Sequence, residues 1–567
     1  MPEQFSVTVD KDVPMRTRDG TILRSDVYRP VQSGRYPVLL GRTQYGKDSW
    51  GQWIAPLRTA ALGYAVVIND MRGQSASEGE FDPFVYDVED SYDVVEWCAE
   101  QPWSDGKVGM FGSSSCGFVQ LQAAISQPPH LVAIAPKQTW SSFARGCVYD
   151  PGGAYSMYTQ QWALLQTNID PRGRIGADRP DFADVQQAAS RAMWELGRWH
   201  QHLPVKELPP LPQDVAPYYF RWLEHPDEDE FWAKRNIAAQ YDKIDIPALH
   251  LVGWFDRFCV STQRNYLGIL QRGGPNARRN QHIVFGPWPH GVPVVVESGD
   301  QHFGPKGSVD VRGLMIRWYD LWLKGADLDV PPVRLYTLGE DRWRDEQEWP
   351  LARTQWTSFY LRGQGKANSL YGDGLLSPEA PGAEPPDSYL YDPADPTPAV
   401  PGKLERPRGT VDQTPIEQRP DVLVYTTPPL ERDLEVTGPI TARLWAATSG
   451  RDTDWMVKLV DLYPNGYAFR LSAGMIRARY RLSQARQELL EPGQVYEYEI
   501  ELGPTSNLFR AGHRIRVEIA SASFPEFDRN FNTGGRFGEE TAGVAATQLI
   551  FHDQSRPSHL VLPVIPR

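Results

Sequence analysis

Unbroken apolar runs of strand length constrain the fold of this chain more than any other feature. Four of them, YPVLLGR, YAVVINDMRG, KVGMFG and LVAIAP, are each followed by turn residues, and a helical pattern runs from about Tyr86 to Gln101. Strands covered by helices on both faces give such unbroken runs, because no side of the sheet meets water. The alternation predicts an α/β fold with a doubly wound parallel sheet. Antiparallel strands around an Asp19-Gly20 turn precede it.

The alternation is interrupted once and then resumes. Strand signals disappear from about Ser141 to Gln240, where amphipathic pieces indicate a helical cap, and return in IPALHLVGWFD and NQHIVFGPWPH. After a proline-rich, linker-like segment, GAEPPDSYLYDPADPTPAVPG, short alternating runs predict an all-β domain. We therefore expect three domains: a discontinuous α/β domain at 1–144 and 241–352, a helical cap at 145–240, and a jelly-roll β-sandwich at 353–567.

Charge and composition exclude several classes of function. The net charge is −13, from 58 basic and 71 acidic side chains, which disfavours nucleic-acid and anionic-membrane binding because both need a positive surface. The N-terminus lacks a secretory pattern, and four cysteines are too few for a disulfide framework, so we expect a cytoplasmic protein. No metal-ligand spacing, P-loop or dinucleotide motif is present, so we infer no metal and no cofactor. A homodimer is left open.

The segment FGSSSCGF, residues 111–118, lies between the buried run KVGMF and a helical pattern, and so on a strand-to-helix turn. Such a turn can present a nucleophile if small residues flank it on both sides; the alternative is an ordinary loop of small residues. Spacing allows Ser114 or Ser115 equally and disfavours Ser113, which would place Phe111 at the crowded position. Cys116 is nucleophilic only as a thiolate, and a buried, inert cysteine is the simpler interpretation.

A serine nucleophile needs a base and an orienting carboxylate. Asp256 ends the strand in PALHLVGWFD, and His290 follows the strand in HIVFGPWPH, so both stand after the serine at strand ends. Asp70 also ends a strand, but it precedes the serine and fails the chain order of nucleophile, acid and histidine.

Several motifs in one order resemble those of the cocaine esterase branch of serine hydrolases. That branch also contains X-prolyl dipeptidyl aminopeptidases, α-amino-acid ester hydrolases and glutaryl-cephalosporin acylases. The resemblance covers almost the whole chain and rests on VPMRTRDG, DMRGQSASEGEF, GMFGSSSCGF, GWFDRF, GPWPH and SFPEFDRNFNTGG. It implies an α/β-hydrolase fold with an inserted helical cap and a C-terminal β domain.

The resemblance also implies roles for particular residues. The family pattern Gly-x-Ser-x-x-Gly makes Ser114 the nucleophile, with Asp256 orienting His290 as its base. The implied oxyanion hole combines the backbone N–H of Ser115 with the hydroxyl of Tyr45 in GRTQYGK. Many relatives carry tyrosine where this chain has Ser115, and we expect the lost ring to open space or polarity beside the acyl carbon.

The implied activity is hydrolysis of small-molecule carboxylic esters with a bulky or aromatic acyl group. We expect the acyl pocket between sheet and cap, with Tyr149, Trp162 and Phe258 as lining candidates, although core packing explains each equally well.

Three alternatives remain open. An aminopeptidase or amino-acid ester hydrolase would need cap carboxylates to hold an amine, and the cap contains Asp150, Asp170 and Asp184. Arg257, if it points inward, disfavours such a substrate. The second alternative is a carbohydrate-binding protein with an inert hydrolase domain, and the third is acyl transfer to an acceptor other than water.

Overall fold

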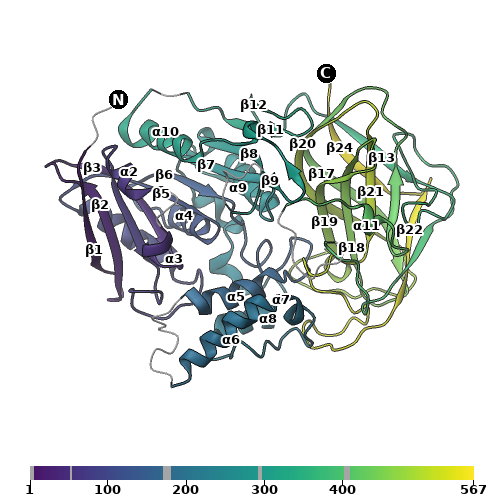
Figure 1. Ribbon diagram of the computed structural model, residues 1–567, viewed down its shortest axis with the longest axis horizontal. Helices are drawn as coiled ribbons and strands as arrows, with labels where there is room; N and C mark the ends of the chain where they lie inside the picture. The colour runs from purple at the N-terminus through teal and green to yellow at the C-terminus, as the bar shows by residue number, and fades with distance from the viewer. Residues whose placement is uncertain (1–4, 51–53, 170–179, 292–296, 328, 401–408) are drawn as a thin grey trace.

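The structure is a computed structural model that describes residues 5–50, 54–169, 180–291, 297–327, 329–400 and 409–567. An α/β domain and a β domain lie side by side, and a group of helices from the middle of the chain lies along both (Figure 1). None of the helices in the described part of the chain combines the length and apolarity that a bilayer crossing needs.

The α/β domain is built on a sheet of ten strands among the described residues. The sheet order is β1-β2-β4-β3-β5-β6-β7-β8-β11-β12, in which β4 through β11 pair in parallel and β1, β2 and β12 pair antiparallel. The strands are β1 (Val7–Arg16), β2 (Ile22–Pro30), β3 (Tyr36–Thr43), β4 (Ala65–Asp70), β5 (Ser104–Ser113), β6 (Leu131–Lys137), β7 (Ala248–Phe255), β8 (Gln281–Pro289), β11 (Val333–Thr337) and β12 (Arg342–Glu346).

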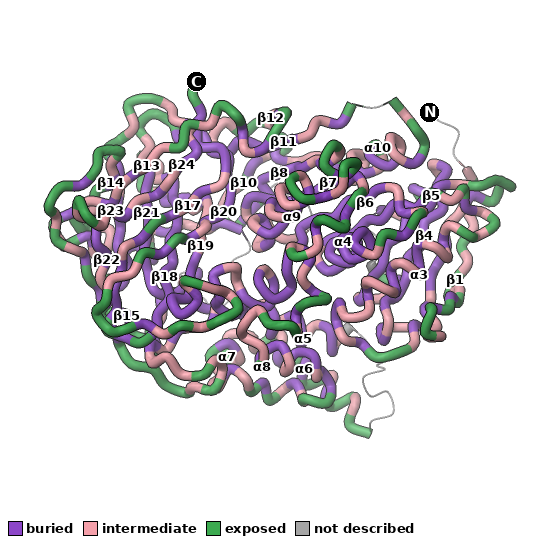
Figure 2. Tube along the Cα trace, turned by 180° about the vertical axis from the view of Figure 1, so that it is seen from behind, coloured by how far each residue is buried: buried purple, intermediate pink, exposed green. Residues whose placement is uncertain are grey.

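Helices cover both faces of this sheet, as the apolar runs predict. In β3, Val38 and Leu40 pack toward the face that holds α3 (Asp87–Glu100) and α4 (Ser115–Ser126), while Leu39 packs toward α10 (Val311–Lys324). Successive side chains of a strand point to opposite faces, so each face receives its own core. The central strands are accordingly buried in Figure 2. The remaining helices and short strands of this domain are α1 (Lys47–Trp50), α2 (Pro56–Ala60), α9 (Cys259–Arg272), β9 (Glu297–Ser298), β10 (Gln301–His302) and 3₁₀ helices at Ala277–Arg279 and Pro305–Gly307.

The inserted region is helical. Its α-helices are α5 (Tyr158–Ile169), α6 (Phe182–Trp194), α7 (Leu196–His200) and α8 (Pro217–Glu224), followed by 3₁₀ helices at Glu230–Arg235 and Ala238–Lys243. The chain then returns to the sheet through β7, so the insertion connects two neighbouring strands, β6 and β7. In Figure 1 these helices lie below the sheet and reach the β domain.

The C-terminal domain consists of β-strands with one short α-helix, α11 (Thr414–Glu417), and a 3₁₀ helix at Ala478–Tyr480 among its described residues. Its long strands β17 and β20 pair over most of their length, and β18 pairs with β19 and β21. A jelly-roll connectivity stays a prediction. The strands are β13 (Gln355–Arg362), β14 (Leu375–Ser377), β15 (Asp387–Tyr391), β16 (Leu423–Thr426), β17 (Leu434–Thr448), β18 (Asp454–Leu462), β19 (Ala468–Arg477), β20 (Tyr496–Phe509), β21 (Arg514–Ala520), β22 (Ala546–Asp553), β23 (Arg556–Pro557) and β24 (His559–Ile565).

The linker-like segment at 382–402 contains a strand that its composition hides; its last two residues lie outside the described part of the chain. β15 alternates buried and exposed residues and pairs with β22. One of its inward positions is Asp387, whose carboxylate accepts hydrogen bonds from the Tyr425 hydroxyl and the Ala367 N–H. The segment resembles a linker because prolines flank the strand on both sides, Pro385 and Pro386 before it and Pro393 after it.

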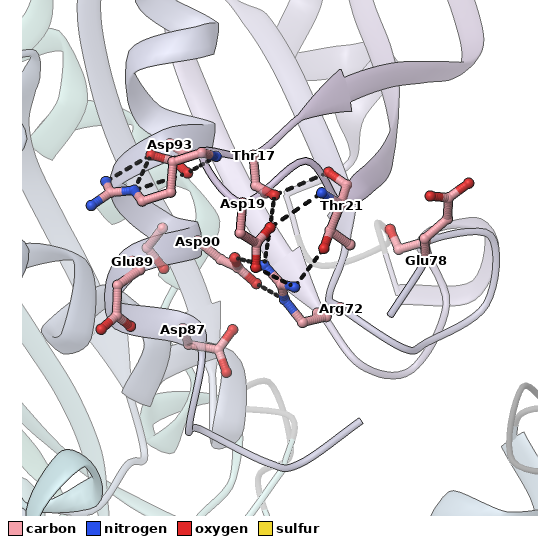
Figure 3. Close-up of polar contacts among 12 residues, drawn as sticks. Thr17, Asp19, Thr21, Arg72, Glu78, Asp87, Glu89, Asp90 and Asp93 are labelled. Carbon is pink, nitrogen blue, oxygen red and sulfur yellow. Dashed lines mark hydrogen bonds and ion pairs between the residues drawn. The ribbon is translucent and has the colours of Figure 1, made fainter. Parts of the chain in front are cut away.

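An ionic network ties the N-terminal hairpin to α3 (Figure 3). Arg72, from the DMRG motif, bonds the carboxylate of Asp90 through Nη2 at 2.6 Å and reaches Asp19 of the hairpin turn at 2.9 Å. Arg18 forms a second pair with Asp93 at 2.7 Å. The motif therefore holds the turn, the loop after β4 and helix α3 together on this side of the sheet.

Candidate active site

Ser114 occupies a strained turn between β5 and α4. Its backbone has φ 60° and ψ −125°, a region that side-chain-bearing residues rarely adopt. The turn is possible because of its glycines: a Cβ on Gly112 would lie 2.5 Å from the Cys116 oxygen, and one on Gly117 would lie 2.9 Å from the Lys137 oxygen. This is the geometry of a nucleophile elbow, in which the serine is lifted out of the helix.

The neighbours of Ser114 in FGSSSCGF are less accessible. Ser114 keeps an intermediate exposure, whereas Ser115 and Cys116 are fully buried at the start of α4. Burial raises the pKa of Cys116 to about 12, so its thiol stays protonated and non-nucleophilic at neutral pH. Of the residues weighed as nucleophiles, Ser114 is the one with the elbow conformation.

Asp256 and His290 meet at the end of adjacent strands. His290 Nδ1 lies 3.0 Å from Asp256 Oδ2, while Asp256 Oδ1 accepts the Phe258 N–H at 2.7 Å. An ionised carboxylate only accepts, so Nδ1 carries the proton in this pair and Nε2 is left as the basic nitrogen. Both residues line the same large cavity.

Lys137 at the end of β6 and Gln138 directly after it form hydrogen bonds to the turn that carries His290. The Gln138 amide donates to the Pro289 oxygen at 2.9 Å and accepts from the Gly291 N–H at 3.2 Å. Lys137 Nζ donates to the Gly291 oxygen at 3.1 Å, and its own carbonyl accepts the Ser114 N–H at 2.9 Å. These two residues connect the serine turn to the histidine turn, and we did not predict them. The polar pair directly after the apolar run LVAIAP was the available signal.

Tyr45 stands on the loop after β3, and its hydroxyl has two hydrogen-bond donors. Ser115 Oγ lies 2.9 Å away and Trp162 Nε1 lies 3.0 Å away. The loop is anchored by Asp70, whose carboxylate accepts the Lys47 N–H at 2.7 Å and the Lys47 Nζ at 3.0 Å. Asp70 thus supports the loop that presents Tyr45 and takes no part in the histidine pair.

A cavity of about 980 Å³ has Asp256 and His290 in its wall, to which the α/β part, the inserted helices and the β part of the chain all contribute; Ser114 and Tyr45 are not among the residues that line it. Trp254 and His290 come from the α/β domain, Trp162 and Leu165 from the cap helix α5, and Met456 from β18 of the β domain. In the described residues no group of three or more His, Cys, Asp or Glu side chains is arranged to hold a metal ion.

The three predicted lining residues lie in different environments. Trp162 belongs to the cavity wall and is 7% exposed. Tyr149 also borders the cavity, but its hydroxyl is bonded to the Trp222 oxygen at 3.0 Å. Phe258 is fully buried, and its ring meets the His290 ring edge-on, with 5.1 Å between the two ring centres. Phe258 therefore packs behind the histidine, and its role as a pocket residue stays a prediction.

Charged residues of both signs face the cavity. Arg257 lies in the wall, with its guanidinium 3.7 Å from the centre of the Tyr158 ring and a hydrogen bond to Ser156 Oγ at 2.9 Å. Asp150 also borders the cavity, and burial raises its pKa to about 7. Asp184 is exposed on α6, and Asp170 lies outside the described residues.

Comparison with known proteins agrees with this architecture. Residues 19–292 match the X-Pro dipeptidyl-peptidase (S15) family, and residues 325–561 match the C-terminal non-catalytic domain of X-Pro dipeptidyl-peptidases. The chain is 40% identical to the cocaine esterase of Rhodococcus sp. (strain MB1 Bresler) over 580 residues, which covers 99% of both chains.

Two solved structures are similar over 99% of this chain and 97% of their own. An aminopeptidase from a marine-sediment Thaumarchaeota archaeon has a TM-score of 0.82 at 26% identity. An α-amino acid ester hydrolase has a TM-score of 0.81 at 25% identity.

A doubly wound sheet with a serine elbow, an inserted helical cap and a C-terminal β domain defines an α/β-hydrolase of the serine type. This confirms the predicted fold class. The chain belongs to the cocaine esterase and X-Pro dipeptidyl-peptidase family and is a serine ester hydrolase, as the motif order indicates.

Proposed function

We propose that this protein hydrolyses small-molecule carboxylic esters through an acyl-enzyme formed on Ser114. The observation that carries the proposal is the His290–Asp256 pair, which lies at the cavity wall with Nε2 left as the basic nitrogen. The serine elbow stands on β5, and β6 and β7 separate it from β8, whose end leads to His290. The carboxyl ends of parallel strands share one edge of the sheet, which supports a common site.

In the proposed mechanism Ser114 Oγ attacks the acyl carbonyl while His290 Nε2 takes its proton. Asp256 holds the imidazole in the required tautomer and stabilises the imidazolium that forms. The negative oxygen of the tetrahedral intermediate would be met by the Ser115 N–H and the Tyr45 hydroxyl. The Ser115 N–H opens helix α4, where backbone N–H groups have no acceptor within the helix.

The acyl-enzyme then forms and breaks down by proton transfers through the same histidine. His290 gives its proton to the alcohol oxygen as the ester C–O bond breaks, and the alcohol leaves. A water molecule next loses a proton to His290 and attacks the acyl carbon; the bond from that carbon to Ser114 Oγ then breaks, and His290 returns the proton to Oγ as the acid leaves. Transfer to another alcohol or an amine would use the same residues.

The cavity supports a bulky or aromatic acyl group. Trp162 from the cap and Trp254 from β7 contribute apolar surface to its wall. The Arg257 guanidinium in the same wall disfavours a substrate with an ammonium beside the acyl carbon, although Asp150 leaves an amino-acid ester as a second candidate. Hydrolysis of matched esters with and without an α-amino group separates the two.

Location and assembly stay proposals. We propose a cytoplasmic location, which the four free cysteines support because none is paired in a disulfide. A homodimer is left as a proposal that a sedimentation measurement tests.

The decisive experiment is a panel of chromogenic esters and amides assayed with the parent enzyme and with Ser114→Ala. We expect ester hydrolysis that falls by at least about 10³-fold in the variant, while a nitrophenyl phosphonate labels the parent alone. Equal rates for the two proteins would reject the mechanism. Hydrolysis of amides but not esters would reject the proposed substrate class.

A further inference from the structure

The Tyr45 hydroxyl oxygen lies between two side-chain donors from different parts of the chain. Trp162 Nε1 is 3.0 Å away on cap helix α5, and Ser115 Oγ is 2.9 Å away in the first turn of α4. An indole nitrogen can only donate, so the direction of the Trp162 bond is fixed. The Ser115 hydroxyl is the donor in the second bond.

These two bonds determine what the Tyr45 proton can do. A phenol oxygen has one proton and two acceptor positions, and here both acceptor positions are occupied. The proton is therefore directed to a third partner. Donors to the phenol oxygen also polarise its O–H group, which makes it a stronger donor in turn. Burial raises the pKa of Tyr45, which keeps the proton on the oxygen at neutral pH, and the bonds from Ser115 and Trp162 act in the opposite sense.

The side chain of Ser115 has no surface in the cavity. Ser115 is fully buried, so the shorter residue does not open the space that we expected beside the acyl carbon. Its hydroxyl is used instead within the protein, against Tyr45. The polarity that this position adds acts on the tyrosine and not directly on the substrate.

Trp162 is buried and packs against aromatic rings of the cap. The centre of its ring lies 5.7 Å from that of Trp222 and 6.1 Å from that of Tyr218, and both of these residues belong to cap helix α8. It also forms part of the cavity wall. One cap residue thus touches both the substrate cavity and the Tyr45 hydroxyl.

We propose that Ser115 and Trp162 are positioning residues that aim the Tyr45 O–H at the substrate oxyanion, so that Ser115 contributes through its side chain as well as its backbone. The inference rests on the proposed function, in which Tyr45 and the Ser115 N–H form the oxyanion hole. Through Trp162, the cap would then support the oxyanion hole as well as line the acyl pocket.

The test is a double-mutant cycle on one good ester substrate, with Ser115→Ala, Tyr45→Phe and the double variant. The rate of phosphonylation by a nitrophenyl phosphonate is measured in parallel, and active-site titration corrects for misfolded protein. Tyr45→Phe should lower kcat by about 10²–10³-fold. Ser115→Ala keeps its N–H and should lower kcat by about 5–10-fold with KM within about 2-fold, because it removes one hydrogen bond to the donor.

The outcome in the Tyr45→Phe background decides the inference. There, Ser115→Ala should change kcat by less than about 2-fold, because no phenol oxygen remains to accept its bond. Ser126→Ala is the matched control: its hydroxyl bonds the Ala123 oxygen at the other end of α4, and its kcat should equal that of the parent. Trp162→Phe provides a second variant: its place in the cavity wall predicts a change in KM in both backgrounds, whereas its kcat loss should be smaller in the Tyr45→Phe background, where the bond to the phenol oxygen is absent.

An equal loss for Ser115→Ala in both backgrounds, or none in either, would overturn the positioning role. Failure of the proposed function has a different signature, since Ser114→Ala would then remain as active as the parent. A Tyr45→Phe enzyme with parental kcat would also overturn the inference, even with Ser114 essential.

Discussion

Lys137 donates a hydrogen bond from Nζ to the main-chain oxygen of Gly291, one residue beyond His290, over 3.1 Å. The lysine is 5% exposed, and burial lowers its pKa from the usual 10.5 to about 7 while the charge of Asp256 opposes the shift. A cation is thus held near the candidate acid–histidine pair, and its charge changes close to neutral pH.

This pKa predicts a pH dependence of stability. Below about pH 7 the folded protein bears the full cost of a buried ammonium, and between pH 7 and 10.5 the unfolded chain binds more protons than the folded one. The free energy of unfolding should therefore rise with pH in this window. From pH 6 to pH 9 we expect the parent to gain about 2–3 kcal/mol more than Lys137→Met, measured by urea titration. A constant difference between the two proteins would show that Lys137 does not titrate there.

Gln138 is predicted to position the histidine turn. Gln138→Ala removes its bonds to the Pro289 oxygen and the Gly291 N–H on either side of His290. We expect kcat to fall by about 10-fold with KM within about 2-fold, because the base is less well held. Gln101→Ala, which removes an amide bond to the Trp97 oxygen on α3, is the control and should leave both constants unchanged. A rise in KM together with a fall in kcat would instead indicate a general distortion of the cavity.

Asp256 and Asp70 both lie at strand ends, but we expect substitution of Asp256 to lower kcat and substitution of Asp70 to lower folding stability. Asp256→Asn keeps the shape of the pair but disturbs the histidine tautomer, so kcat should fall by about 10⁴-fold with little change in the thermal midpoint. Asp70→Asn removes one of the two carboxylates that Lys47 Nζ contacts, the other being Asp12 at 2.7 Å, and should cost about 1–3 kcal/mol of folding free energy. Calorimetry measures the thermal midpoint of both variants, and ester kinetics measures their kcat. A stability loss confined to Asp256→Asn with a kcat loss confined to Asp70→Asn would contradict the proposed roles.

Asp528 is predicted to join the β domain to the cap. Its carboxylate bonds Arg477 at 2.9 Å and the Tyr155 N–H at 2.8 Å, and its own N–H donates to the Tyr155 oxygen at 2.9 Å. Asp528→Ala should cost about 3–5 kcal/mol, because it leaves the buried Arg477 partly unpaired.

The control for this prediction is Glu497→Ala, which removes an exposed ion pair with Arg443 in the same domain and should cost less than about 1 kcal/mol. Thermal unfolding of both variants measures the difference. Similar midpoints for the two would contradict a special role for Asp528.

Local pattern was sufficient for the central strands of the α/β domain, but it left Ser114 and Ser115 tied as the nucleophile, and the family pattern chose Ser114. The runs that became β3, β4, β5 and β6 are apolar because both their faces are buried, and that property is visible in the chain itself. Asp256 and His290 could be chosen from chain order and strand ends, and the structure places them 3.0 Å apart. β15 was missed because it is five residues long and prolines flank it on both sides.

Sequence by itself determined the fold class, the family and a short set of candidate residues, because these depend on periodicity and on motif order. Only the tertiary structure decided how distant residues share one site. Trp162 reaches Tyr45 across 117 positions of the chain, and Met456 of the β domain lines the same cavity as His290. For Ser115 the sequence shows a small polar residue, and the fold directs its hydroxyl to Tyr45. Such contacts depend on how the domains pack, which no local pattern encodes.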